Sequence, residues 1–219
     1  MSNDKQIQKP NTSKRTEIST SAKGIEIERK GKPIVGSTKT GYVYLLVDCS
    51  ISMRGNKITQ AKNGALSFAK NALAKGYITG LIQFDSDARL LCEPGEDISI
   101  LARAVEKINI GDLTHMAKAI DKAYNHLKDM TGAKVIVVVT DGVPNGEGDP
   151  ETTLRTAKMA KTNGIDIIVI GTDDADREFL RQLASRSDLS VKTANIQLEK
   201  TIGEAAIMLP PVNKRDQKT

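Results

Sequence analysis

Two runs of apolar residues in this chain each end abruptly in an aspartate. Residues 43–47 are all aliphatic or aromatic and are followed by Asp48, and residues 135–139 are all valine or isoleucine and are followed by Thr140 and Asp141. Short, continuous apolar runs are typical of strands that are buried on both faces of a parallel sheet. We therefore expect a sheet with both faces covered and with carboxylates at the ends of two strands.

From residue 42 onward, apolar runs alternate with longer amphipathic segments, which predicts an α/β fold. We expect strands at 42–47, 78–84, 88–92, 134–140, 165–170 and 190–194, and helices at 57–75, 98–108, 114–130, 151–163, 176–186 and 197–208. The link at 85–87 is too short for a crossover helix, so the second and third strands should form a hairpin. The predicted architecture is a doubly wound (Rossmann-like), mainly parallel six-stranded sheet with one antiparallel edge strand and helices on both faces.

The net charge of +5 on 219 residues is confined to the two ends of the chain. Residues 1–40 hold nine Lys and Arg against four acids, and residues 213–219 hold three against one. That leaves 20 basic and 22 acidic residues for 41–212, a net charge of −2. We expect a flexible basic tail with a possible edge element at 1–40, one domain at 41–212 and a C-terminal tail at 213–219. Only the tails favour nucleic acid, so nucleic-acid association is the weaker expectation.

Three features favour a cytoplasmic protein without membrane contact. No segment approaches the roughly 20 apolar residues that span a bilayer. The first residues are polar and lack the apolar region of a secretory signal. The sequence contains two cysteines, Cys49 and Cys92, too few for a disulfide framework. Cys49 is expected to be a small buried residue.

Hydroxyl and carboxylate side chains gather where the predicted strands end. In an open α/β sheet, ligands collect beyond the carboxyl ends of the strands. An aspartate and two serines follow the first strand, a threonine opens the predicted helix at 114–130, and another aspartate follows the fourth strand. Such oxygen ligands select a hard cation, Mg²⁺ in the first place, with Mn²⁺ or Ca²⁺ possible. The candidate metal ligands are Asp48, Ser50, Ser52, Thr114 and Asp141.

The same residue types have a structural alternative, since Asp, Ser and Thr are ordinary N-cap and turn residues. Nearby polar residues have similar alternatives. Asp85 or Asp87 could reach a water at the site or only form the turn, and His115 could line the cleft or only begin a helix. The loop with Glu147 and Asp149 could shape partner specificity or cap the next helix.

The spacing Asp48-x-Ser50-x-Ser52, followed by Thr114 and by Thr140-Asp141-Gly142, resembles the von Willebrand factor type A (VWA) family over roughly residues 41–211. The resemblance implies a metal-ion-dependent adhesion site that offers a divalent cation to an Asp or Glu carboxylate of a partner protein. Two residues depart from the family's usual sequence. Ile51 stands where glycine is usual, and Leu113 lies where glycine or serine is frequent, so both could alter loop shape and affinity.

The resemblance implies a stand-alone, prokaryotic-type adaptor or regulator in a cytoplasmic complex, and not an enzyme. Its partner could be an AAA+ ATPase or a Ser/Thr kinase and phosphatase system, with the N-terminal tail as a phosphorylation target. A metal-dependent hydrolase or phosphatase-like enzyme remains an alternative, because a bound cation lowers the pKa of its water. The sequence lacks a Gly-x-Ser-x-Gly elbow and a phosphate loop. A third possibility is nucleic-acid association through the basic tails.

Overall fold

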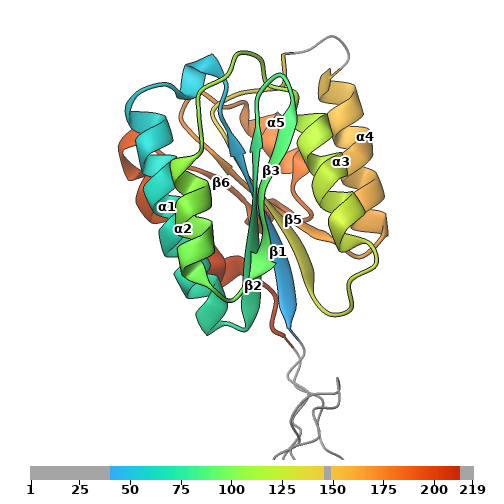
Figure 1. Cartoon of the computed structure of the whole chain (residues 1–219). Coiled ribbons are helices and arrows are strands. Elements are labelled where there is room, and N and C mark those ends of the chain that lie inside the picture. Colours follow the sequence, from blue (N-terminus) through green and yellow to red (C-terminus); the bar gives the residue numbers. More distant parts are fainter. Residues whose placement is uncertain (1–39, 146–148, 213–219) are drawn as a thin grey trace, which may run out of the picture. The chain divides into compact units, whose positions relative to one another are not determined.

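The computed structural model describes residues 40–145 and 149–212, which form a six-stranded sheet of order β3-β2-β1-β4-β5-β6 (Figure 1). Neighbouring strands pair in parallel except β2 and β3, which pair antiparallel. The predicted sheet and its antiparallel edge strand are confirmed. The strands are β1 (Gly41–Asp48), β2 (Tyr77–Phe84), β3 (Ala88–Gly95), β4 (Lys134–Thr140), β5 (Asp166–Gly171) and β6 (Ser190–Lys192). Apart from Thr40, the tails predicted at 1–40 and 213–219 lie outside the described residues.

Helices cover both faces of the sheet, as predicted (Figure 1). One face carries α1 (Asn56–Ala74), α2 (Ile98–Glu106) and α6 (Leu198–Glu204), and the other carries α3 (Met116–Leu127), α4 (Asp149–Thr162) and α5 (Arg177–Leu183). The central strands β1 and β4 are buried along nearly their whole length. Small residues on α1 let a neighbouring helix approach closely, since a Cβ on Gly64 would lie 2.8 Å from the Ile202 side chain of α6.

Several helix ends differ from the predicted ones, and short 3-10 turns lie between the regular elements. The turn η1 (Ile51–Met53) follows β1, η2 (Ser187–Leu189) precedes β6 and η3 (Asn195–Gln197) precedes α6. The helix predicted at 197–208 divides into α6 and η4 (Ala205–Met208). The helix predicted to open at Thr114 begins at Met116 instead.

The strand order places a topological switch between β1 and β4. From β1 the chain runs to β2 and β3 on one side of the sheet, and β4, β5 and β6 then extend the other side. Helices on opposite faces diverge at such a point, and a crevice opens beyond the carboxyl ends of the two strands. The residues at the ends of β1 and β4 therefore lie where this kind of sheet binds ligands.

Candidate metal centre

Three of the candidate ligands form a continuous row of oxygen atoms at this switch point. Ser50 Oγ lies 3.0 Å from Ser52 Oγ, and Ser52 Oγ donates to Asp141 Oδ1 at 2.8 Å. Adjacent oxygens in an octahedral Mg²⁺ shell are about 2.9 Å apart, because each lies 2.0–2.1 Å from the ion. The spacing of this oxygen row therefore fits the coordination shell of a small hard cation.

Asp48 is the last residue of β1, and no basic side chain of residues 40–145 and 149–212 forms an ion pair with it. Its Oδ1 accepts from the backbone amide of Ser50 at 2.9 Å, and its Oδ2 accepts from Thr140 Oγ1 at 2.6 Å. Burial, helped by the nearby charge of Asp141, raises the pKa of Asp48 to about 6, although the hydrogen bonds from Thr140 and Ser50 oppose that shift. A buried carboxylate held only by neutral donors keeps a negative charge that a cation can compensate.

Asp141, by contrast, already faces a cation. Lys57 Nζ lies 2.7 Å from Asp141 Oδ2 and 2.7 Å from Asp174 Oδ2. Partial burial would lower the pKa of Lys57, but its bonds to both carboxylates outweigh that effect and raise it. The hydrogen bond from Lys57 lowers the pKa of the exposed Asp174. A lysine ammonium thus occupies one side of Asp141, while Ser52 occupies the other.

Thr114 lies in a loop beside this row but is not bonded to it through its hydroxyl. The loop is attached to the end of β1 by Gly111 N, which donates to Cys49 O at 2.7 Å, and by Ile51 N, which donates to Asp112 O at 3.2 Å. Thr114 itself is buried, and it precedes the N-cap of α3. The structure therefore brings Thr114 to the same edge of the sheet without a hydrogen bond to the other candidate ligands.

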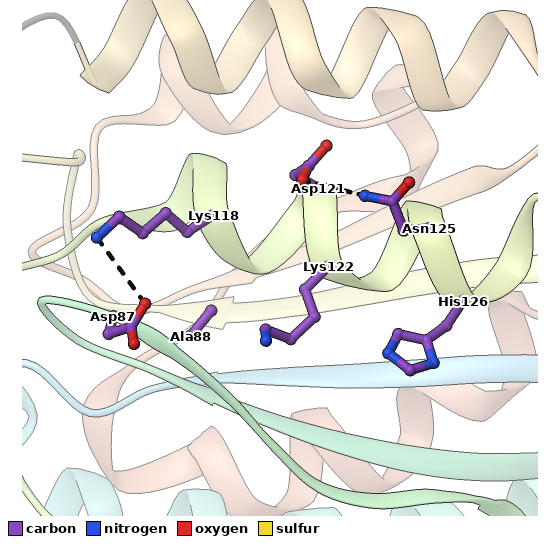
Figure 2. A pocket seen from close by; sticks show the side chains of 7 residues that line it. All are labelled: Asp87, Ala88, Lys118, Asp121, Lys122, Asn125 and His126. Atoms are coloured by element: carbon purple, nitrogen blue, oxygen red, sulfur yellow. Dashed lines mark hydrogen bonds and ion pairs between the residues drawn. The ribbon is translucent and has the colours of Figure 1, made fainter.

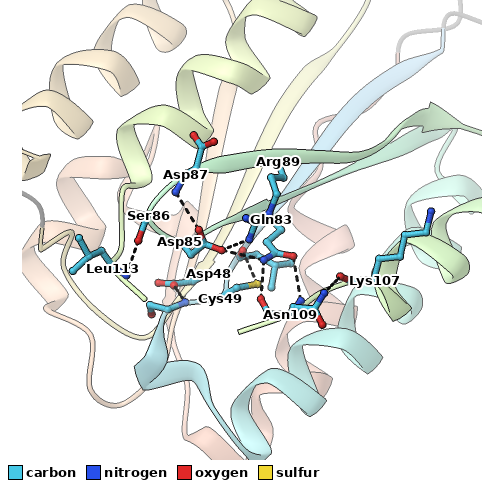
Figure 3. A network of polar contacts seen from close by, with 12 residues as sticks. Asp48, Cys49, Gln83, Asp85, Ser86, Asp87, Arg89, Lys107, Asn109 and Leu113 are labelled. Carbon is cyan, nitrogen blue, oxygen red and sulfur yellow. Dashed lines mark hydrogen bonds and ion pairs between the residues drawn. The ribbon is translucent and has the colours of Figure 1, made fainter. Parts of the chain in front are cut away.

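Another buried carboxylate, that of Asp85, anchors the Thr114 loop to the end of β2 (Figure 3). Asp85 accepts from Asp87 N at 3.1 Å and from Gln83 Nε2 at 3.1 Å, and it pairs with Arg89. The side-chain amide of Gln83 donates through Nε2 to Asn109 O at 2.7 Å and accepts at Oε1 from Asn109 N at 3.2 Å. The prediction that Asp85 forms the turn is confirmed, and it also holds the segment that leads to Thr114.

The backbone of this segment passes very close to Asp85. A Cβ on Gly111 would lie 2.4–2.5 Å from the Asp85 side chain, so only glycine fits there. Further along the same segment, His115 N donates a hydrogen bond to Asp85 O at 2.8 Å. His115 occupies the N-cap position of α3, in agreement with the simpler of its two expected roles.

The remaining predictions near the centre have mixed outcomes. Cys49 is fully buried, as predicted, and burial raises the pKa of its thiol. Asp149 lies in the first turn of α4, where burial raises its pKa and the amides of Met116 and Ala117 at the start of α3 oppose that shift. It thus supports helix ends, while Glu147 lies outside the described residues.

The loop shape tolerates Ile51 without backbone strain. Ile51 begins η1, and among the described residues a positive φ occurs only at glycines. A β-branched residue is compatible with this turn because it needs no left-handed conformation. The departure at Ile51 therefore changes the surface of the loop and not the course of its backbone.

A cleft of about 410 Å³ lies away from the oxygen row, between β3 and α3 (Figure 2). Its polar side chains contact each other or solvent, and the cleft includes none of the candidate ligands. Lys118 Nζ lies 3.8 Å from Asp87 Oδ1, and Asp121 accepts from Asn125 at 3.1 Å. We therefore assign the candidate metal centre to the strand ends and not to this cleft.

The sequence reasoning missed Lys57, Asp174 and Asn145. Lys57 lies in the first turn of α1, where the helix dipole disfavours a cation. A lysine in this unfavourable position could have indicated a nearby acidic partner. Asp174 follows β5 at the same sheet edge as the predicted ligands. Asn145 Oδ1 accepts from Thr114 N at 2.9 Å, a contact for which the sequence gives no sign.

In residues 40–145 and 149–212, no group of three or more His, Cys, Asp and Glu residues is arranged to hold a metal ion. A centre at the strand ends would thus depend on hydroxyls in addition to its two carboxylates. None of the helices in these ranges has the length and apolar character needed to cross a membrane.

Comparison with known proteins gives a family match over most of the chain. The family described as the von Willebrand factor type A domain matches residues 43–204. A UPF0353 protein of Mycolicibacterium gilvum is 27% identical over 146 residues, which cover 58% of this chain and 43% of that protein. Complement factor B of Bos taurus is 25% identical over 192 residues, which cover 74% of this chain and 25% of that protein. The chain spans less than half the length of either relative.

Solved structures show the same fold. The vWF domain of the type V pili tip protein Mfa5 from Porphyromonas gingivalis superposes with a TM-score of 0.70 at 15% identity, covering 82% of this chain and 99% of that one. Proximal thread matrix protein 1 from the mussel byssus, with a zinc-occupied MIDAS motif, has a TM-score of 0.62 at 17% identity, covering 77% and 46%. At these identities the likeness establishes the fold.

Proposed function

Because the chain belongs to the von Willebrand factor type A family, whose domains are protein-interaction modules, we propose that it binds Mg²⁺ at the switch point and uses the ion to hold an acidic residue of a partner protein. The observation that carries this proposal is the oxygen row of Ser50, Ser52 and Asp141, with spacings of 3.0 and 2.8 Å. In this proposal Asp48 and Thr114 complete the ligand set, directly or through water.

The donor set explains why the centre would seek a further anion. Its hydroxyls are neutral, and of its two carboxylates Asp141 is already paired with Lys57. When bound, Mg²⁺ supplies a positive centre that prefers oxygen ligands and readily keeps an exchangeable position. Asp48 and Ser50 are buried, whereas Ser52 is exposed. The chain therefore closes the inner side of the site and leaves the side of Ser52 open to a partner.

We place the protein in the cytoplasm as an adaptor or regulator, with an AAA+ ATPase or a Ser/Thr kinase and phosphatase system as its partner. The unpaired state of Cys49 and Cys92 supports a reducing compartment. The chain's match to an interaction family supports docking rather than turnover. Purification with such a candidate partner, in Mg²⁺ and then in EDTA, tests this assignment: the complex should dissociate in EDTA.

Isothermal titration calorimetry with Mg²⁺ and Mn²⁺ tests the metal site itself. Wild type should bind both ions, and Ser52→Ala should bind them at least about tenfold more weakly because the central oxygen of the row is lost. Ser99→Ala on α2 is the matched control, since it removes an exposed serine hydroxyl away from the site and should bind like wild type. Equal affinity of Ser52→Ala and wild type would contradict the proposed ligand set.

A further inference from the structure

The loops around the candidate metal centre carry exposed apolar side chains. The described residues include eight large apolar side chains that are exposed, and three of them lie within two residues of a candidate ligand. One stands between the two serines, one directly precedes the threonine, and one follows the aspartate after β4 by two positions. These three, here called the apolar rim, are Ile51, Leu113 and Val143, with exposed fractions of 55%, 40% and 37%.

Backbone and side-chain bonds bring the three loops of the apolar rim together. Ile51 N donates to the carbonyl of Asp112, the residue before Leu113, at 3.2 Å. Thr114 N donates to Asn145 Oδ1 at 2.9 Å, which joins the loop of Leu113 to that of Val143. The bond between the serine pair and the aspartate after β4 joins the first loop to the third. The three apolar residues therefore lie on loops that meet at the oxygen row.

Met53 belongs to the same 3-10 turn as Ile51 and is fully buried, so the two apolar side chains of this turn have opposite environments. Single exposed apolar residues are ordinary on protein surfaces. Three of them on loops that are bonded to one another form a local concentration of exposed apolar surface, and such exposed apolar patches mark interaction sites.

We infer that the apolar rim is a docking surface for a partner segment in which an Asp or Glu is flanked by apolar side chains. This inference rests on the proposed function, because the carboxylate of that segment would complete the metal centre. The charge at the centre requires an anion, and the apolar side chains around it bury the flanking residues. Excluding water in this way lowers the local dielectric and strengthens the contact between cation and carboxylate.

Labelled peptides of defined sequence test this inference by fluorescence anisotropy in Mg²⁺. The probes are a capped peptide with one Glu between leucines, the same peptide with Glu between serines, and a third with Gln between leucines. The Glu peptide with leucines should bind about tenfold tighter than the one with serines, because its side chains bury apolar area on the rim. The Gln peptide should bind at least about tenfold more weakly than the Glu peptide with leucines. EDTA should abolish binding of both Glu peptides.

Variants of the rim test which residues provide the preference. Ile51→Ser combined with Leu113→Ser should bind the two Glu peptides within about twofold of each other while keeping wild-type Mg²⁺ affinity in calorimetry. Ile207→Ser is the matched control, because Ile207 is 73% exposed in η4, and the backbone there bonds Lys75 at the far end of α1. This control should keep the full preference for leucine.

The outcomes separate the inference from the function on which it rests. If neither Glu peptide binds in Mg²⁺, the proposed function and the inference both fail. If both Glu peptides bind equally and in a Mg²⁺-dependent way, the function stands and the inference is wrong. The inference is equally overturned if the rim variants keep the leucine preference, or if the Gln peptide binds as tightly as its Glu counterpart.

Discussion

Two buried aspartates end neighbouring strands of this sheet, and their surroundings differ in a way that separates structure from function. Asp85, after β2, pairs with Arg89 and accepts from Gln83 and from a turn amide. Asp48, at the end of β1, accepts only from a neutral hydroxyl and a neutral amide. Arg89 neutralises the first carboxylate (Figure 3), whereas no described residue forms an ion pair with the second. A buried charge with no protein counter-charge indicates a place for an external one.

Removing the carboxylate of Asp85 should strongly destabilise the folded protein. Asp85→Ala should lower the free energy of unfolding by about 3 kcal/mol, because donors on Gln83, Arg89 and the turn lose a buried acceptor. Urea unfolding in EDTA measures this effect. Asp87→Ala is the matched control, since that side chain is 69% exposed. If the two variants are equally stable, the Asp85 network does not hold the loop as described.

Removing the charge of Asp48 should instead stabilise the metal-free protein. Its folded pKa of about 6 lies above the ordinary 3.8, so the folded state holds the proton more tightly. Without metal, that contribution is complete below about pH 3.8 and is lost as the pH rises through 6, at a cost on the order of 3 kcal/mol. Asp48→Asn should therefore be more stable than metal-free wild type above pH 6, by about that amount.

Urea unfolding of both proteins over this pH range checks the prediction, with Mg²⁺ added in a second series. Added Mg²⁺ should stabilise wild type more than Asp48→Asn, since the variant keeps the oxygen row but lacks one of the two carboxylates of the proposed site. If Asp48→Asn is less stable than metal-free wild type above pH 6, the charge of Asp48 is already compensated. The contrast with Asp85 would then disappear.

Asp141 is intermediate between the two aspartates, because its counter-charge is a lysine that competes with a metal ion. Lys57→Met should raise Mg²⁺ affinity about tenfold, since it removes a cation 2.7 Å from Asp141 Oδ2. Calorimetry measures the change, and Lys70→Met, on an exposed position of α1, is the control. A loss of affinity in Lys57→Met would mean that the lysine positions Asp141 for the ion.

Local sequence patterns predicted the framework because they reflect local physics. The apolar runs before Asp48 and Asp141 identified β1 and β4, and the short link at 85–87 identified the antiparallel hairpin. The candidate ligands were chosen by the same reasoning, since parallel strands bring their carboxyl ends to one edge. Whether the candidate ligands bind a metal stays a prediction.

Such local patterns could not predict contacts between distant segments of the chain. Lys57 bonds Asp174, which lies 117 positions later in the chain, and no periodicity links the two. The start of α3 moved from Thr114 to Met116 because tertiary bonds hold the preceding residues. Thr114 N bonds the side chain of Asn145, and His115 N bonds the carbonyl of Asp85. Propensity alone could not predict these bonds.

A crystal structure of the protein grown in Mn²⁺, with an anomalous difference map, would show whether the strand ends bind a cation. We expect an anomalous peak bounded by oxygens of Ser50, Ser52 and Asp141, at the switch between β1 and β4. A map with no peak there, while Mn²⁺ binds elsewhere on the protein, would rule out a metal centre at this switch point.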